Sequence, residues 1–297
     1  MSRILVMGDV VDDIVVRPLT DVTEASDTNA EIRMHAGGSA ANVAAWLGHL
    51  GADAVFLGRA GATGVDRHTD ALAAFGVDAR IASDPDRDTA TIVLNLDGSG
   101  ERTMYVDRGA NAAFTAEDIP DNAFADVVWL HLTGYSLFDP AVRPAVLQLV
   151  DMARAAGAGI SVDPSSIGFL KACLTGEFLG WIEGVDLIFP NLLEGQFLTG
   201  KTQADEVAAA LASRFEHVVL KMGSAGGLYA DSKGNTVDQR AMDATIVDTT
   251  GAGDAFAAGF LHTWMADLDA TSAMQSGADA AAQAVSAMGA RPQTTKA

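Results

Sequence analysis

The chain has 297 residues and a formal net charge of −20, so it lacks the excess of Lys and Arg that neutralises nucleic-acid or anionic-membrane phosphates. About half of its residues (49%) are apolar, which is enough for a core, yet no apolar run reaches the ~20 residues of a membrane span. We therefore expect no nucleic-acid partner and no membrane partner. The single cysteine, Cys173, excludes an intramolecular disulfide and favours a cytoplasmic location.

Short apolar strands alternate with helical patterns along the chain. The expected strands are 4–7, 54–58, 91–95, 127–131, 159–162, 187–190, 218–221 and 227–230. The expected helices are 40–49, 66–74, 141–156, 192–198, 205–213, 254–264 and 270–287. This alternation predicts an α/β fold with a mainly parallel sheet that is flanked by helices on both faces.

Two polar, alternating segments interrupt this rhythm, and the second is typical of a β-hairpin around Asp97-Gly98-Ser99-Gly100. We expect residues 13–36 and 87–108 to form a small β-sheet lid over the carboxyl edge of the main sheet. Residues 1–12, 37–86 and 109–297 then make up the core that binds nucleotide and substrate. The alternative is that the two segments are surface hairpins without a role.

Carboxylates follow the first expected strand in the order Asp9, Asp12 and Asp13. An ionised Asp at the carboxyl end of a strand can accept hydrogen bonds from two hydroxyls of a polyol. The alternative is that these residues are turn residues with solvated charges. The spacing alone favours the solvated turn.

The glycine pair Gly37 and Gly38 leads into the next expected helix, whose first turn carries Ser39 and Asn42. The glycines allow a small ligand to approach the backbone, and Asn42 offers both a donor and an acceptor to a hydroxyl. The alternative is a glycine turn with Ser39 as the helix N-cap.

Asn191 and Glu194 lie where an expected strand gives way to a helix. Their spacing favours a capping box, and the alternative places them at a nucleotide phosphate and at water bound to Mg²⁺. Further along, Lys221 and Gly223 end another strand, where a cation and a close backbone approach suit a nucleotide.

The stretch Asp248-Thr249-Thr250-Gly251-Ala252-Gly253-Asp254-Ala255-Phe256 places a carboxylate where a Gly-rich turn becomes a helix. The free backbone N–H groups and the positive end of the helix dipole form an anion site there. Asp254 beside a bound phosphate is suited to take a proton from an attacking hydroxyl. The alternative, equally favoured locally, is that Asp254 only caps its helix.

Taken in this order, the motifs resemble those of the ribokinase-like (PfkB) family of sugar and nucleoside kinases. The resemblance runs from Ile4 to about Pro292, and its most specific part is the stretch from Asp248 to Phe256. It implies an α/β core with a β-sheet lid and an enzyme that transfers the γ-phosphoryl group of ATP to a primary hydroxyl of a sugar. It also implies a homodimer through the lid.

The resemblance implies a role for each matching residue. Asp254 is the expected base, and the backbone N–H groups of Gly251, Ala252 and Gly253 stabilise the transferred phosphoryl group. The remaining matches are Asn191, Lys221 and Gly223 for ATP, Glu194 for Mg²⁺ through water, Asp248 and Thr250 for a monovalent cation such as K⁺, and Asp13, Gly37, Gly38 and Asn42 for the sugar.

The resemblance implies the substrate less precisely than it implies the family and the reaction. Val11, Ser39 and His131 depart from polar positions of ribokinases, whereas the segment from His131 to Tyr135 is similar to fructokinases and 2-keto-3-deoxygluconate kinases. Arg108 either pairs with an anionic group of the sugar or forms a salt bridge with Asp107 or another surface acid. We expect a ketose or an acidic keto-sugar. The alternatives are a ribokinase or nucleoside kinase, and a non-catalytic sugar- or nucleotide-binding regulator.

Overall fold

A large central sheet forms the body of the protein. The computed structural model describes residues 2–22, 24–96 and 102–293, so the predicted turn at 97–100 lies outside the described residues. The strand order is β13-β12-β11-β10-β9-β8-β1-β4-β5. The strands are β1 (Arg3–Met7), β4 (Asp53–Gly61), β5 (Asp78–Asp84), β8 (Val127–Thr133), β9 (Gly159–Asp163), β10 (Leu187–Ile188), β11 (His217–Lys221), β12 (Gly227–Asp231) and β13 (Thr236–Gln239). All pairings are parallel except those that β12 makes with β11 and β13.

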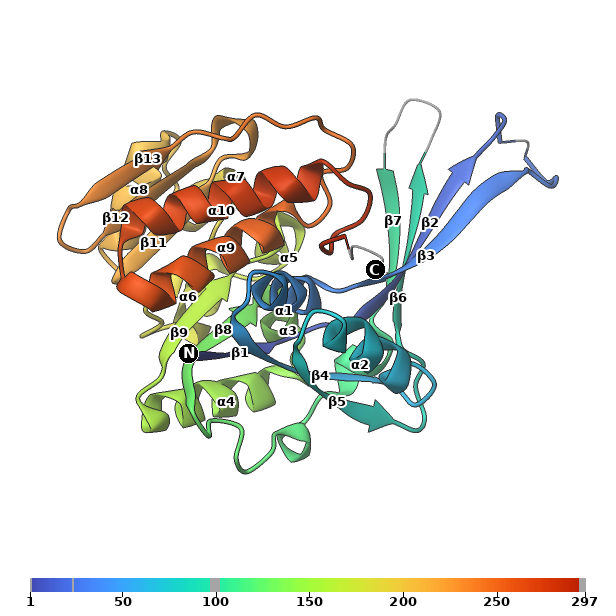
Figure 1. Ribbon diagram of the computed structural model, residues 1–297, viewed down its shortest axis with the longest axis horizontal. Coiled ribbons are helices and arrows are strands. Elements are labelled where there is room, and N and C mark those ends of the chain that lie inside the picture. Colours follow the sequence, from blue (N-terminus) through green and yellow to red (C-terminus); the bar gives the residue numbers. More distant parts are fainter. Residues whose placement is uncertain (1, 23, 97–101, 294–297) are drawn as a thin grey trace.

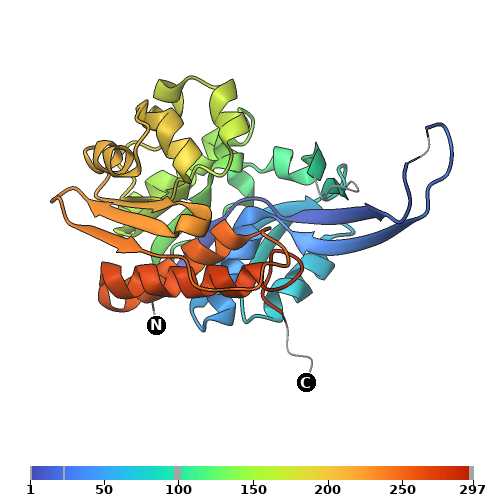
Figure 2. The same ribbon diagram turned by 90° about the horizontal axis from the view of Figure 1, so that it is seen from above.

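Helices cover both faces of this sheet, which lies between two helical layers in Figure 2. One layer contains α1 (Ser39–His49), α2 (Val65–Ala73), α9 (Ala252–Asp267) and α10 (Ala270–Val285). The other contains α4 (Arg143–Ala156), α6 (Thr175–Trp181), α7 (Leu192–Thr199) and α8 (Ala204–Ala212). The short helices α3 (Gly134–Phe138) and α5 (Ile167–Ala172) follow β8 and β9. The expected α/β class is therefore confirmed.

Small residues allow α9 and α10 to pack closely. A Cβ added at Gly259 of α9 would lie 2.4 Å from the carbonyl oxygen of Ser276 in α10. Because no larger side chain fits at this contact, the Ala- and Gly-rich composition of both helices brings their backbones together. This packing fixes α9, whose first turn carries Asp254.

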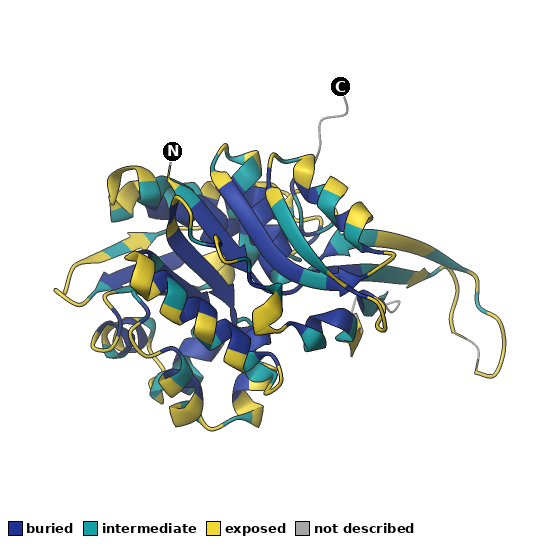
Figure 3. Cartoon of the chain, turned by 90° about the horizontal axis from the view of Figure 1, so that it is seen from below, coloured by how far each residue is buried: buried dark blue, intermediate teal, exposed yellow. Residues whose placement is uncertain are grey.

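A second sheet projects from the body at the upper right of Figure 1. It contains β2 (Val11–Pro18), β3 (Ala30–Gly37), β6 (Ala90–Leu96) and β7 (Arg102–Asp107), in the order β3-β2-β6-β7. Its pairings are antiparallel except the parallel pairing of β2 with β6. Its strands are largely intermediate or exposed, whereas the central strands of the main sheet are buried (Figure 3).

Several elements differ from the expectation. The strands β5 and β13 and the helices α3, α5 and α6 were not predicted, and β10 contains only Leu187 and Ile188 of the expected 187–190. Both missed strands are edges of the sheet. An edge strand is only partly covered, so its sequence does not need the continuous apolar run of a central parallel strand. No helix among the described residues is long and apolar enough to cross a membrane.

Candidate active site

A cavity of about 1110 Å³ lies between the carboxyl ends of the main strands and the small sheet. Of the predicted site residues, Gly37 alone is not part of its lining. Those that line it are Asp13, Gly38, Asn42, Arg108, Asn191, Glu194, Lys221, Gly223, Asp248, Thr250, Gly251, Ala252, Gly253 and Asp254. Residues that are far apart in sequence thus converge on one cavity.

Asp254 lies in the first turn of α9, after a left-handed Gly251 (φ 76°) that serves as the N-cap residue. Ser39 Oγ donates to Asp254 Oδ1 at 2.7 Å, and Asn42 Nδ2 donates to Asp254 Oδ2 at 2.9 Å. Burial raises the pKa of Asp254 to about 6, although these two hydrogen bonds oppose the shift. The reading of Asp254 as merely a helix cap is therefore wrong, because its oxygens bind side chains of α1.

Ser39 is likewise not the N-cap of α1, because that position belongs to Gly38. Gly38 has φ 95°, and a Cβ there would lie 2.3 Å from the carbonyl oxygen of Asp9. Only glycine accommodates this close approach. The turn aims the first residues of α1 at Asp254.

Asp13 packs against Gly37, where an added Cβ would lie 1.9 Å from Asp13 Oδ2. Burial raises the pKa of Asp13 to about 6, while the positive charge of Arg291 opposes the shift and the negative charge of Asp254 adds to it. The two carboxylates thus influence each other electrostatically across the cavity.

The other carboxylates after β1 are paired rather than solvated, contrary to the expected turn. Asp9 accepts from Arg108 Nη1 at 2.8 Å and from Nη2 at 3.1 Å, so the pair is bidentate. Asp12 accepts from Arg67 Nη2 at 2.7 Å and contacts His68 Nε2 at 3.0 Å. Asp9 and Asp12 are both buried, at 7% and 8% exposure, which explains why each needs a cation or donor.

Arg108 finds its partner in Asp9 at the end of β1 and not in Asp107 or a surface acid. Its Nε lies 4.0 Å from Asp139 Oδ2 and has no hydrogen-bond partner among the described residues. The guanidinium charge is thus already opposed by one buried carboxylate and by a second nearby.

Glu194 and Asn191 form the capping box that their spacing favours. Glu194 Oε2 accepts from the Asn191 N–H at 2.8 Å, and Asn191 Oδ1 accepts from the Glu194 N–H at 2.9 Å. Glu194 is only 1% exposed, and its burial, together with the nearby charge of Asp163, raises its pKa to about 7. Capping therefore holds a buried acid with a raised pKa at the cavity wall.

Lys221 forms an ion pair with Asp163, the last residue of β9. Burial lowers the pKa of Lys221, but the negative charges of Asp163, Glu194 and Asp254 together outweigh it and the net shift is upward. The ammonium lies beside the first turn of α9, since a Cβ added at Gly253 would be 3.3 Å from Lys221 Nζ. Asp163 was missed in the sequence because a single Asp at a strand end carries no motif.

Asp248 and Thr250 shape the loop before α9. Asp248 Oδ1 accepts from Thr250 N at 3.0 Å and from Thr250 Oγ1 at 2.7 Å, and Asp248 Oδ2 accepts from the Gly289 N–H at 3.1 Å. The described part of the chain contains no group of three or more His, Cys, Asp or Glu residues arranged to hold a metal.

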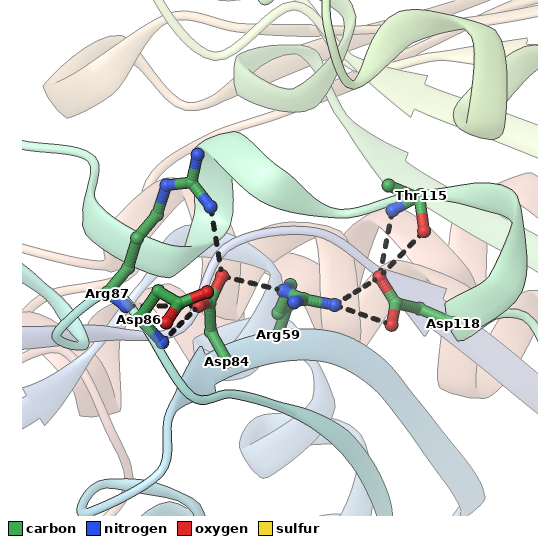
Figure 4. Close-up of polar contacts among 6 residues, drawn as sticks. All are labelled: Arg59, Asp84, Asp86, Arg87, Thr115 and Asp118. Atoms are coloured by element: carbon green, nitrogen blue, oxygen red, sulfur yellow. Dashed lines mark hydrogen bonds and ion pairs between the residues drawn. The ribbon is translucent and has the colours of Figure 1, made fainter.

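An ion-pair cluster around Arg59 lies where the chain passes between the two sheets (Figure 4). Arg59 Nε donates to Asp84 at 3.0 Å, and Arg59 Nη1 donates to both oxygens of Asp118 at 2.7 and 2.9 Å. Asp84 also accepts from the backbone N–H groups of Asp86 and Arg87, which lead toward β6. The cluster therefore ties the segment that leads into β6, and the segment after β7 that contains Asp118, to β4 of the main sheet.

Comparisons with known proteins agree with this architecture. The family described as pfkB family carbohydrate kinase matches residues 1–297. The fructokinase of Klebsiella pneumoniae is 31% identical over 274 residues, covering 88% of this chain and 83% of the relative. The ATP-dependent ribose-1-phosphate kinase of Halopiger xanaduensis is 32% identical over 292 residues, covering 93% and 89%.

Solved structures give the same result. A probable sugar kinase from Rhizobium etli superposes with a TM-score of 0.89 at 26% identity, covering 99% of this chain and 96% of that one. A putative ribokinase II from E. coli, solved with ATP and Mg²⁺, has the same fold, with a TM-score of 0.86 at 23% identity and coverage of 98% and 94%.

The chain therefore belongs to the PfkB family of carbohydrate kinases. Its members are phosphotransferases with an alcohol group as acceptor, and the predicted enzyme class is confirmed.

Proposed function

We propose that this protein is an ATP-dependent kinase that phosphorylates a primary hydroxyl of a ketose, with Asp254 as the base. One observation carries the proposal: Asp254 lies at the N-terminus of α9, inside the cavity, with each carboxylate oxygen held by a side chain of α1. A base held in one orientation before the substrate arrives needs little reorganisation during the reaction.

Asp254 takes the proton as the hydroxyl attacks the γ-phosphoryl group. Its pKa of about 6 leaves it ionised at neutral pH but more basic than an ordinary Asp, which improves proton transfer. The N–H groups of Gly251, Ala252 and Gly253 begin α9, where helix N–H groups lack intrahelical partners and stabilise developing negative charge. Lys221 beside Gly253 adds a cation to the same region.

The residues present fit ATP and Mg²⁺. Asn191, Lys221 and Gly223 line the cavity on the nucleotide side, and Glu194 supplies the carboxylate oxygen that a hard cation prefers. Burial and the negative charge of Asp163 raise the pKa of Glu194, so a cation bound nearby would favour its ionised form, which supports a role toward Mg²⁺-bound water. When bound, Mg²⁺ neutralises charge on the transferred phosphoryl group. Asp248 and Thr250 are proposed to hold a monovalent cation such as K⁺.

The sugar is proposed to bind at Asp13, Gly38 and Asn42, with Gly37 shaping the wall behind Asp13. We favour a neutral ketose over an acidic keto-sugar, because the bidentate pair with Asp9 already neutralises Arg108. Similarity to a fructokinase supports the same choice.

The small sheet, with segments 13–36 and 87–108, is proposed to be a lid over the sugar. Its cavity-facing side presents the apolar side chains Val15, Leu94 and Met104, which pair across the strands. Met104 is 52% exposed, and covering such a face with a second copy of the chain would remove apolar surface from water. We therefore propose a homodimer through the lid.

The test is a coupled ADP-release assay with ATP and D-fructose, 2-keto-3-deoxygluconate, D-ribose and adenosine. Fructose should give the highest kcat/KM, and Asp254→Asn should lose that activity. Arg108→Ala should weaken neutral and acidic ketoses alike, because it leaves Asp9 unpaired. A selective loss of the acidic sugar would instead assign Arg108 as an anion reader, and a preference for adenosine would overturn the sugar-kinase assignment.

A further inference from the structure

Arg291 reaches the active site from the segment that follows α10. Trp46 Nε1 donates to the carbonyl oxygen of Ala290 at 2.9 Å, which pins this segment to α1. Ala290 also packs against the catalytic turn, since a Cβ added at Gly251 would lie 2.6 Å from the Cβ of Ala290. The backbone that carries Arg291 is therefore fixed relative to both helices of the site.

The guanidinium of Arg291 lies behind the residues that face the cavity. Nη2 donates to the Gly37 carbonyl at 3.0 Å, and Nε donates to Asn42 Oδ1 at 3.4 Å. Nη1 is shielded from solvent and has no hydrogen-bond partner within the described ranges. Burial lowers the pKa of Arg291 to about 10, with Asp13 opposing, so the group stays cationic at neutral pH. Arg291 is partly buried, and its Nη2 and Nε are held by Gly37 and Asn42 while Nη1 is shielded from water.

Arg291 and Asp254 together favour one orientation of the Asn42 amide. A guanidinium only donates hydrogen bonds, and an ionised carboxylate only accepts them. Asn42 lies between the two, with Oδ1 toward Arg291 and Nδ2 toward Asp254. In the opposite orientation, Nδ2 would face the guanidinium donors and Oδ1 would face the carboxylate oxygens. Only one orientation therefore satisfies both neighbours.

We propose that Arg291 is a positioning residue for phosphoryl transfer, which orients the Asn42 amide so that it donates to Asp254. This inference rests on the proposed role of Asp254 as base. Without Arg291 the amide can rotate, and the carboxylate then loses a donor that holds it in place and favours its ionised form. The sequence gives no sign of this role, because Arg291 lies outside every recognised motif.

The first arm of the test measures kcat with ATP and D-fructose. Arg291→Gln should lower kcat roughly 10- to 100-fold, the size expected when a reacting group is misplaced. Arg291→Lys keeps the positive charge but not the planar guanidinium with its several donors, and should lower kcat less than Arg291→Gln does. Arg143→Lys is the matched control, since Arg143 donates to the carbonyls of Leu137 at 2.6 Å and Phe138 at 3.2 Å outside the cavity lining. It should leave kcat unchanged.

A double-mutant cycle with Asn42→Ala separates positioning from a general structural effect. If Arg291 acts through Asn42, Arg291→Gln should reduce kcat far less in the Asn42→Ala background than in the wild type. An equal reduction in both backgrounds overturns the proposal. Circular dichroism checks that each protein is folded, and if Arg291→Gln is not, Arg291→Lys completes the same cycle.

A second arm needs no substrate and so remains decisive if fructose is not phosphorylated. In protein labelled with ¹⁵N at asparagine, the Asn42 side-chain amide signal is identified by its absence in Asn42→Ala. Its hydrogens should exchange at least about 10-fold faster in Arg291→Gln than in the wild type or Arg143→Lys, because the amide is no longer held. Unchanged exchange overturns the proposal, whereas absence of kinase activity in the wild type alone contradicts the proposed function.

Discussion

The carboxylate of Asp254 is held where its surroundings oppose its charge. Burial raises its pKa from 3.8 to about 6, and donation from Ser39 and Asn42 only partly offsets this. A raised pKa means that the folded state binds the proton more tightly than the unfolded chain. The stability that protonation of Asp254 adds to the folded state is complete below pH 3.8 and is lost as the pH rises through 6. The ionised form, which the proposed base needs for the reaction, is therefore the form that destabilises the fold.

Asp254→Asn should accordingly lower kcat by roughly 10²- to 10⁴-fold, while the wild-type rate should rise with pH through an ascending limb near 6. The same variant should be more stable than the wild type at pH 8, by on the order of 2 kcal/mol, with the gap closing toward pH 4. Kinetics and thermal unfolding at several pH values check both. Asp151→Asn, at a side chain 77% exposed, is the control and should change neither. A destabilised Asp254→Asn at pH 8 would contradict the electrostatic account.

Between elements, the ion-pair cluster around Arg59 joins β4 and β5 of the main sheet to the segments that precede β6 and follow β7 (Figure 4). Arg59, at the end of β4, binds Asp84, the last residue of β5, whose side chain is only 1% exposed. It also binds Asp118 beyond the β6–β7 hairpin. An ion pair that is shielded from water is costly to break, because the remaining partner keeps its charge without compensation.

Arg59→Ala should destabilise the protein by about 3 kcal/mol, as removal of one partner from a buried pair does. It should also raise the KM for sugar, because the base of the proposed lid is no longer tied to the core. Arg3→Ala is the matched control, since Arg3 binds Asp53 and Asp78 at the opposite ends of β4 and β5. Those acids are 46% and 42% exposed, so the cost should stay below about 1 kcal/mol. Equal losses of stability in urea titrations of both variants would refute the shielding argument.

At the scale of the whole molecule, the small sheet stands out from the body (Figures 1 and 3). Apolar side chains lie on both of its faces, with Met104 on one and Ile32 on the other. Met104→Glu, on the cavity-facing side, should convert the proposed dimer to a monomer in light scattering, because burial of a charge in an apolar interface is unfavourable. Ile32→Glu, on the opposite face and 64% exposed, is the control and should remain dimeric. A wild type that is monomeric at micromolar concentrations would contradict the dimer.

Local patterns were sufficient for much of the architecture. The central strands were predicted because a parallel strand covered on both faces requires a short apolar run, as in Ile4–Met7 and Val218–Lys221. The helices of the main layers other than α6 followed from periodicity, and the expected strand-end residues do converge on one cavity. The edge strands β5 and β13 were missed because partial exposure relaxes their composition.

The sequence by itself determined the fold class, the family and a set of residues that line the cavity, because each depends on a local pattern. Only the tertiary structure decided which side chains form hydrogen bonds or ion pairs with one another. Ser39 and Asp254 are 215 positions apart, and Arg291 is 254 positions from Gly37, yet both pairs are hydrogen-bonded. The pairing of Arg108 with Asp9 was equally hidden, since partner choice depends on distance in space and on burial. The sequence alone does not show which groups compensate a charged residue, because its partners come together only when the chain folds.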